Sequence, residues 1–230
     1  MKPDVIIVGL FLMLACSAIV DAFLRAFYHK KYKRALLFKG IASACFIAFG
    51  AYNFFSRDFS WTILAIFIGL CWGIVGDEII AFCQLYPQKD TQYFIGGGVF
   101  FVVGHVFYMI ALLMLAKFNF VAVAIVLLIG ILLSAIYGHR KKYLSTDIKN
   151  SLMLYLSIVI LFAAVGAGSF LVRGTLGTAL FAIGGVLFTV SDNILFAFKY
   201  GHRPRYRQNV ILHIAYYLAQ FAIAWSIALV

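Results

Sequence analysis

Long apolar runs separated by short polar connections follow one another along the whole chain. A membrane-spanning helix needs about 20 consecutive, mostly apolar residues, and eight stretches meet this requirement. We place them at about residues 5–24, 35–55, 61–85, 93–116, 119–137, 150–172, 174–198 and 209–230. The pattern therefore predicts an all-α polytopic membrane bundle of eight transmembrane helices, forming one integral membrane domain over residues 1–230.

The composition agrees with a membrane protein and excludes a soluble domain. Hydrophobic residues make up 65% of the 230 residues and charged residues only 12%. Soluble domains carry about 45–50% apolar and about 25% charged residues. The net charge of +11 comes from short basic segments between the predicted spans. We therefore expect membrane lipids as partners and no nucleic acid.

The distribution of basic residues predicts the orientation in the membrane. Fifteen of the 19 Lys and Arg residues fall on one side of the predicted bundle when Lys39 is counted with the first connection. Since cytoplasmic connections are enriched in Lys and Arg, we expect a multi-pass membrane protein, in the inner membrane if the cell is bacterial. Both termini would lie on the non-cytoplasmic side. Asp21, four residues before Arg25, is expected to form an interfacial ion pair with it.

Two predicted spans carry acidic residues. Asp77 and Glu78 lie in the stretch GLCWGIVGDEIIAFCQLY at 69–86, and Asp192 lies in GGVLFTVSDNILFAF at 184–198. An Asp at the centre of a bilayer costs about 2.5–3.5 kcal/mol on insertion scales, so it faces protein or water and often marks a functional site. A structural role, with the acid hydrogen-bonded between helices, is the alternative.

The two acidic stretches are similar when one is shifted by 115 positions, half the length of the chain. The shift aligns identical residues, namely Gly69 with Gly184, Val75 with Val190, Asp77 with Asp192 and Ile79 with Ile194. Four helices in each half would give both halves the same orientation. We therefore predict two parallel four-helix repeats, at about residues 1–115 and 116–230, each with one buried acid.

Polar side chains recur at helical spacing in the eighth and fourth spans. Positions i, i+4, i+7 and i+11 share one face of a helix, and in the eighth span they are Asn209, His213, Tyr216 and Gln220. His105 and Tyr108 belong to a similar stripe in the fourth span. We expect a polar pocket between the third, fourth, seventh and eighth spans, open toward the cytoplasmic leaflet. Glycines in these spans, such as Gly69 and Gly97, would allow close packing.

Signatures of soluble enzymes are missing from the sequence. It has no G-x-S-x-G, no P-loop, no H-E-x-x-H and no CxxC pair. A metal site built from His105, His213, Asp77 and Asp192 is an alternative, but no pair of them has the spacing of metal ligands. We therefore predict no metal and no cofactor.

Four short motifs carry a resemblance to a known family. At GDEII (76–80), GHVFY (104–108), SDNIL (191–195) and YYLAQ (216–220), the sequence resembles the YhhN-type lysoplasmalogenase family of eight-helix integral membrane proteins. The resemblance covers most of the chain. It implies an ether hydrolase of the EC 3.3.2 type that cleaves the vinyl ether bond of lysoplasmalogens. The products would be a fatty aldehyde and glycerophosphocholine or glycerophosphoethanolamine.

The resemblance also implies roles for individual residues. The paired aspartates of the family correspond to Asp77 and Asp192, and its histidine and glutamine to His105 and Gln220. Vinyl ethers hydrolyse by protonation of the β-carbon, which suits one protonated and one ionised carboxyl group. We predict Asp77 and Asp192 as this catalytic pair, with either as the acid. The residues expected to orient substrate and water are His105, Tyr108, Tyr216, Tyr217, Gln220, Glu78 and Asn193.

Two other functions fit parts of the pattern. Duplicated halves with buried acids also describe proton-coupled membrane transporters. However, the three prolines, Pro3, Pro87 and Pro204, lie outside the predicted spans, so no span is broken. A lipid-binding membrane protein without catalytic activity is a further alternative, but that function does not explain the buried acids. The predicted partners are a lysophospholipid substrate and membrane lipids, and the sequence sets no oligomeric state.

Overall fold

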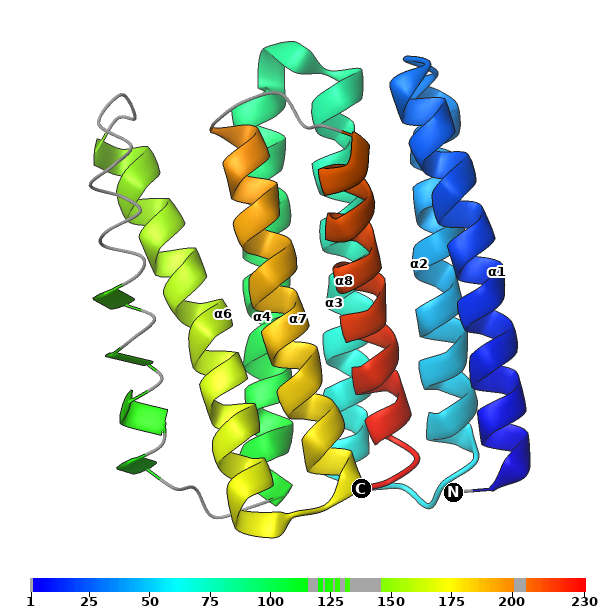
Figure 1. The fold of residues 1–230 in the computed structure, drawn as a ribbon, viewed down its shortest axis with the longest axis vertical. Helices are drawn as coiled ribbons and strands as arrows, with labels where there is room; N and C mark the ends of the chain where they lie inside the picture. The colour runs from blue at the N-terminus through cyan, green and yellow to red at the C-terminus, as the bar shows by residue number, and fades with distance from the viewer. Residues whose placement is uncertain are drawn as a thin grey trace.

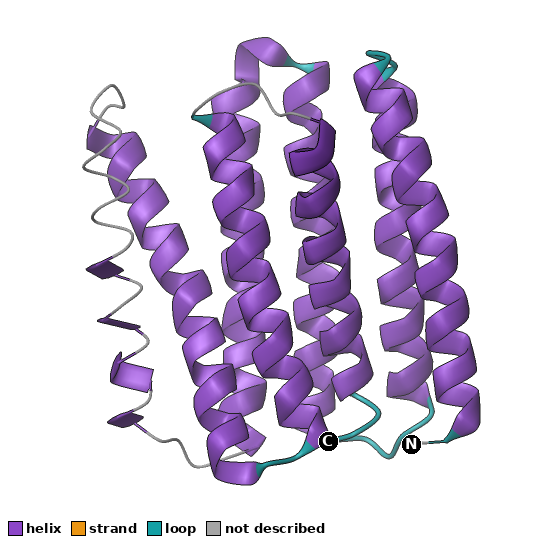
Figure 2. Ribbon diagram, in the orientation of Figure 1, coloured by secondary structure: helices purple, strands orange, loops and turns teal. Residues whose placement is uncertain are grey.

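The computed structural model is a bundle of helices that run side by side along the long axis of the molecule (Figure 1). The structure describes residues 2–115, 120–121, 123–125, 127–128, 131–132, 146–200 and 206–230. The helices are α1 (Pro3–Tyr28), α2 (Tyr32–Phe55), α3 (Trp61–Leu85), the short 3-10 helix η1 (Pro87–Lys89), α4 (Asp90–Leu115), α6 (Thr146–Arg173), α7 (Leu176–Lys199) and α8 (Tyr206–Ser226). Figure 2 shows only helices and loops in these residues, which confirms the predicted all-α class.

The described α-helices begin and end within four residues of the predicted spans. Six helices among the described residues are long and apolar enough to cross a membrane, which confirms a multi-pass membrane bundle. α8 is not one of them, because its polar stripe lowers its hydropathy. The predicted span at 119–137 lies mostly outside the described residues.

α8 lies inside the bundle and carries its predicted polar stripe on a buried face. It packs against α7 and α2 and also contacts α1 and α3. The stripe residues, Asn209, His213, Tyr216 and Gln220, are all buried. A helix can hold such residues within a membrane only where neighbouring helices supply hydrogen-bond partners. The surroundings of α8 are therefore the first place to look for a site.

α3 and α4 approach each other at glycines, as the sequence predicted. A side chain at Gly69 would place its Cβ 3.0 Å from the carbonyl oxygen of Gly104, and one at Gly97 would lie 2.9 Å from that of Gly76. Both distances are too short for a larger residue. This close packing fixes the position of α3, the helix that carries Asp77.

The two ends of the chain lie at the same end of the bundle (Figure 1). An even number of spans requires this arrangement. The side of the membrane that the termini face and the division into repeats at 1–115 and 116–230 both stay predictions.

Candidate functional site

The carboxylate of Asp77 is the centre of a buried hydrogen-bond network. Its Oδ2 accepts hydrogen bonds from the hydroxyl of Ser43 at 2.6 Å and from that of Tyr216 at 2.7 Å. Its Oδ1 lies 3.2 Å from the Nζ of Lys39. All three partners carry hydrogen-bond donors. The geometry therefore places a buried lysine and two hydroxyl groups around the carboxyl group of Asp77.

A chain of hydrogen bonds extends from Asp77 across α8 to α4. The hydroxyl of Tyr108 donates to Oε1 of Gln220 at 3.0 Å, and Nε2 of Gln220 donates to the hydroxyl of Tyr216 at 2.9 Å. Tyr216 then donates to Asp77. Gly73 on α3 makes room for this chain, because a Cβ there would lie 2.6 Å from Nε2 of Gln220. Four of the predicted site residues are thus joined in one directed network.

The buried cation of this network was missed from the sequence. Lys39 was counted with the first connection, but it lies inside α2 and is 8% exposed. Lys39 lies within the predicted span at 35–55, but its charge was counted with the adjacent connection and the residue was not considered as part of a site. Ser43, one helical turn further along α2, faces Asp77 in the same way. The signal was available in the sequence, since the two residues have the i, i+4 spacing of a polar face.

Asp192 occupies a second, separate cluster. Its Oδ2 accepts a hydrogen bond from the hydroxyl of Tyr155 on α6 at 2.9 Å, and the residue is 6% exposed. Among the described residues, no cation pairs with Asp192 and no hydrogen bond joins it to Asp77. Phe188, one turn before Asp192 on α7, lies between the clusters, with its ring 5.6 Å from that of Tyr216. Tyr155 is another residue that the sequence analysis did not single out.

His105 is buried among aromatic rings, and no hydrogen bond joins it to either carboxylate within the described part of the chain. Its Nδ1 lies 2.6 Å from the carbonyl oxygen of Phe101 in the preceding turn of α4. Its ring contacts those of Tyr108, Phe162 and Phe188. Nε2 of His105 is buried and has no hydrogen-bond partner among the residues that the structure describes. The structure thus places His105 next to the end of the network, at Tyr108, rather than on an acid.

Glu78 and Asn193, like Asp192 and His105, lie outside the network. Glu78 is half-buried and packs beside Gly40 on α2, and its buried Oε1 has no hydrogen-bond partner in the described ranges of the chain. Asn193 is exposed, and its amide donates to the carbonyl oxygen of Thr189 on its own helix at 2.7 Å. The structure therefore does not bring Asn193 together with the other candidates.

Tyr217 connects the network to a groove on the surface of the bundle. Its hydroxyl lies 3.3 Å from that of Ser43, which donates to Asp77. Its ring stacks on that of His213 with the ring centres 6.5 Å apart. Both rings line the groove, so the Asp77 network begins directly behind its wall.

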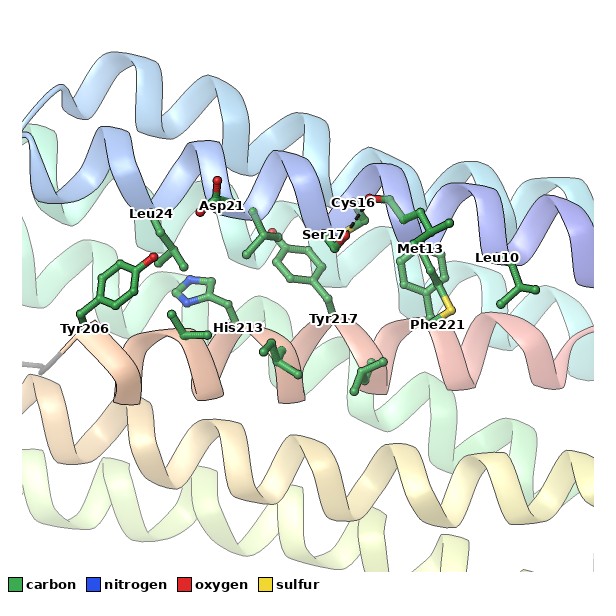
Figure 3. Close-up of a pocket in the computed structure, with 15 residues that line it drawn as sticks. Leu10, Met13, Cys16, Ser17, Asp21, Leu24, Tyr206, His213, Tyr217 and Phe221 are labelled. Atoms are coloured by element: carbon green, nitrogen blue, oxygen red, sulfur yellow. Dashed lines mark hydrogen bonds between the residues drawn. The ribbon is translucent and has the colours of Figure 1, made fainter.

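The groove runs between α1 and α8 and has a cavity volume of about 410 Å³. Figure 3 shows its polar end at Asp21, Tyr206 and His213, and its apolar end at Leu10 and Phe221. The sequence predicted a pocket walled by the third, fourth, seventh and eighth spans. Polar residues of the third, fourth and eighth spans do converge, whereas Asp192 of the seventh span lies in a separate cluster. The groove beside them is formed by α1 and α8, which the sequence pattern does not pair.

No metal-binding group forms within the part of the chain that the structure describes. A set of three or more His, Cys, Asp or Glu side chains able to hold one metal ion is not found there. The four residues considered as a metal site, His105, His213, Asp77 and Asp192, lie in different surroundings.

Comparison with known protein families identifies one match. The model of the YhhN family matches residues 34–227, which is most of the chain. This match confirms the resemblance seen in the four sequence motifs. A search of curated proteins and a search of solved structures found no match.

Proposed function

The chain belongs to the YhhN family, and on this premise we propose that it is a membrane-embedded hydrolase that cleaves the vinyl ether bond of lysoplasmalogens. The products are a fatty aldehyde and a glycerophospho-alcohol such as glycerophosphocholine or glycerophosphoethanolamine. Family membership is consistent with this reaction, and the arrangement of the buried acids and the groove adds independent support.

The observation that carries the proposal is a buried carboxylate just behind the wall of a lipid-facing groove. Tyr217 lines the groove, and two hydrogen-bonded contacts lead from its hydroxyl through Ser43 to Asp77. A catalytic group for a lipid must be within reach of a lipid chain yet shielded from bulk water. The surroundings of Asp77 meet both conditions.

The chemistry of vinyl ether hydrolysis requires an acid and an anion. A proton is added to the β-carbon of the double bond, and the resulting oxocarbenium ion carries positive charge on the α-carbon and the ether oxygen. Water adds to the α-carbon and loses a proton, and the hemiacetal collapses to the aldehyde and the alcohol. Oxocarbenium-like transition states in glycoside hydrolysis are served by two carboxyl groups in the same way.

The surroundings of the two aspartates support different roles for them. Asp77 accepts three donors, including an ammonium group, so it acts as the anion that stabilises the oxocarbenium ion and receives the proton from water. Asp192 has one hydroxyl donor and no cation among the described residues, so it is the group that holds the proton. Asp192 does not line the groove, so in this mechanism the proton passes from its cluster to the substrate. A positioned acid or base of this kind contributes about 10²–10⁴-fold to the rate.

The remaining network residues hold Asp77 in place. Tyr108, Gln220 and Tyr216 form the chain of donors that ends on its Oδ2. Each link fixes the next, so the carboxylate is oriented before substrate binds. Such preorganisation lowers the cost of stabilising charge in the transition state.

The decisive experiment measures aldehyde release from a defined lysoplasmalogen by the purified protein in detergent. An ester-linked lysophospholipid is the matched control substrate, and a parallel reaction contains EDTA. We expect aldehyde from the vinyl ether only, at a rate that EDTA does not change. Loss of activity in EDTA would overturn the carboxylate mechanism. No aldehyde from folded protein would overturn the hydrolase function and favour a proton-coupled transporter.

A further inference from the structure

The groove between α1 and α8 is amphipathic along its length. Its apolar end is formed by Leu10 and Met13 of α1 and by Phe221 of α8, and its polar end by Asp21 and Tyr206 (Figure 3). Binding pockets for small molecules have volumes of about 300–1,000 Å³, and this groove has about 410 Å³. At about 30 Å³ for a group the size of a water molecule, it can accept on the order of a dozen methylene groups.

One side of the groove opens to the surroundings of the bundle. Leu10 and Leu14 on α1 are 50% and 70% exposed, and Ile214 on the α8 side is 51% exposed. Since α1 and α8 are apolar where they border the groove, the open side faces the hydrocarbon of the membrane. A lipid chain can therefore enter sideways without crossing water.

The polar end of the groove offers both signs of charge. Asp21 lines the groove, and Nε of Arg25 lies 2.8 Å from its Oδ2. Both side chains of this ion pair, which the sequence predicted, are partly exposed. A zwitterionic head group complements them, because its phosphate suits the guanidinium and its ammonium suits the carboxylate.

The spacing along the helices relates these two ends to the network. At 1.5 Å per residue, Asp21 lies about 16 Å along α1 from Leu10. Tyr217, whose hydroxyl contacts Ser43, lies between these two levels in Figure 3. The junction between head group and chain therefore falls next to Tyr217.

We propose that this groove binds a zwitterionic lysophospholipid, with its single hydrocarbon chain toward Leu10 and Phe221 and its head group at Asp21 and Arg25. This inference rests on the proposed function for the identity of the bound lipid. In a lysoplasmalogen the vinyl ether joins the glycerol to the chain, so the reactive bond lies beside Tyr217 and the Asp77 network.

The wall that α1 provides lies outside the part of the chain matched by the family model. The match begins at residue 34, whereas α1 spans Pro3–Tyr28. Asp21, Arg25 and the apolar wall are thus features of this chain that family membership does not assign. They supply selectivity for one-chain lipids, because the groove volume of about 410 Å³ holds one hydrocarbon chain rather than two.

A pair of neighbouring substitutions on α1 tests the proposal. Ser17 lines the groove and Ala18 does not, although both are exposed on the same turn. Ser17→Trp fills the groove, whereas Ala18→Trp adds the same side chain toward the lipid. The probe is a lysophosphatidylcholine with a saturated alkyl ether chain, which has no vinyl ether to cleave, and its binding to the purified protein is titrated by native mass spectrometry.

We expect Ser17→Trp to weaken binding by at least about tenfold and Ala18→Trp to change it less than about twofold. Ile214→Trp, on the α8 wall, replaces Ser17→Trp if that variant does not fold. Equal binding to the wild type and to the groove variant would overturn the proposal. Asp21→Asn should weaken binding of the choline lipid more than that of lysophosphatidic acid, which lacks the ammonium group; equal weakening would overturn the head-group assignment.

The probe separates this inference from the proposed function. If lysoplasmalogen yields no aldehyde but the ether probe binds in a manner that depends on Ser17, the groove assignment stands and the hydrolase function fails. If aldehyde is released equally by the wild type and by Ser17→Trp, the hydrolase function stands and the groove assignment fails.

Discussion

Asp77 and Asp192 have the same place in the sequence pattern but different surroundings in the folded protein. Asp77 is held by Lys39, Ser43 and Tyr216, whereas Asp192 bonds to Tyr155 alone among the residues that the structure describes. A carboxyl group beside a buried ammonium group suits the anionic role that we propose for Asp77, and one with a hydroxyl partner and no cation among the described residues suits the acid role that we propose for Asp192. The comparison shows that two acids in similar sequence stretches can have different surroundings, depending on which helices pack against them.

The largest expected effects on aldehyde release and on stability come from replacing Asp77 or Asp192 by asparagine. Both Asp77→Asn and Asp192→Asn should lower aldehyde release by about 10²–10⁴-fold. Only Asp77→Asn leaves Lys39 as an unpaired buried charge, so it should also destabilise the fold by about 3–5 kcal/mol. Asp192→Asn should cost under about 1 kcal/mol, because the amide oxygen still accepts from Tyr155. Thermal unfolding in detergent compares the two variants, and equal losses of stability would contradict the assigned difference.

The pairing of Lys39 with Asp77 can be measured by a double-mutant cycle. Lys39→Met leaves Asp77 buried without its cation and should destabilise the fold by about 3–5 kcal/mol. The double variant Lys39→Met/Asp77→Asn removes both charges and should be more stable than the sum of the single changes implies, with a coupling of about 0.5–3 kcal/mol. Lys39→Arg, which keeps the charge, is the control. Additive effects of the two substitutions would show that the ion pair contributes nothing.

Substitution of one glycine beside each cluster tests how tightly the cluster is packed. Gly73→Ala would push its Cβ against the amide of Gln220, so it should lower turnover by about 10- to 100-fold through misplacement of the donor chain. Gly98→Ala, near the Asp192 cluster, meets the ring of Tyr155 at an ordinary 3.7 Å. It should leave turnover unchanged and stabilise α4 by about 0.5–1 kcal/mol. The assay is aldehyde release with unfolding in parallel, and equal activity of both variants would rule out a role for the donor chain.

The smallest effect on stability and on aldehyde release is expected from substitution of Asn193. Its side chain is exposed and bonds to its own helix, so Asn193→Ala should change stability by less than about 0.5 kcal/mol and leave aldehyde release unchanged. Asp192→Asn, one residue away, is the reference for a side chain that faces the interior. A marked loss of turnover in Asn193→Ala would mean that this amide belongs to the site after all.

The sequence by itself determined the helices and most of the central residues of the site. Apolar length is a local property, so the described helices could be placed within a few residues. The cost of an acid in a membrane marked Asp77 and Asp192, and helical spacing identified Tyr216 and Gln220 on one buried face of α8. These features depend on residues close together in the chain, which is why a pattern could reveal them.

Only the tertiary structure decided which groups meet. Lys39 reaches Asp77, and Tyr155 reaches Asp192, because of how each helix is rotated about its axis and which neighbour it packs against. The groove joins the first and last described helices of the chain, α1 and α8. Such contacts depend on the packing of side chains from distant parts of the sequence, and the apolar pattern of a single helix does not predict them.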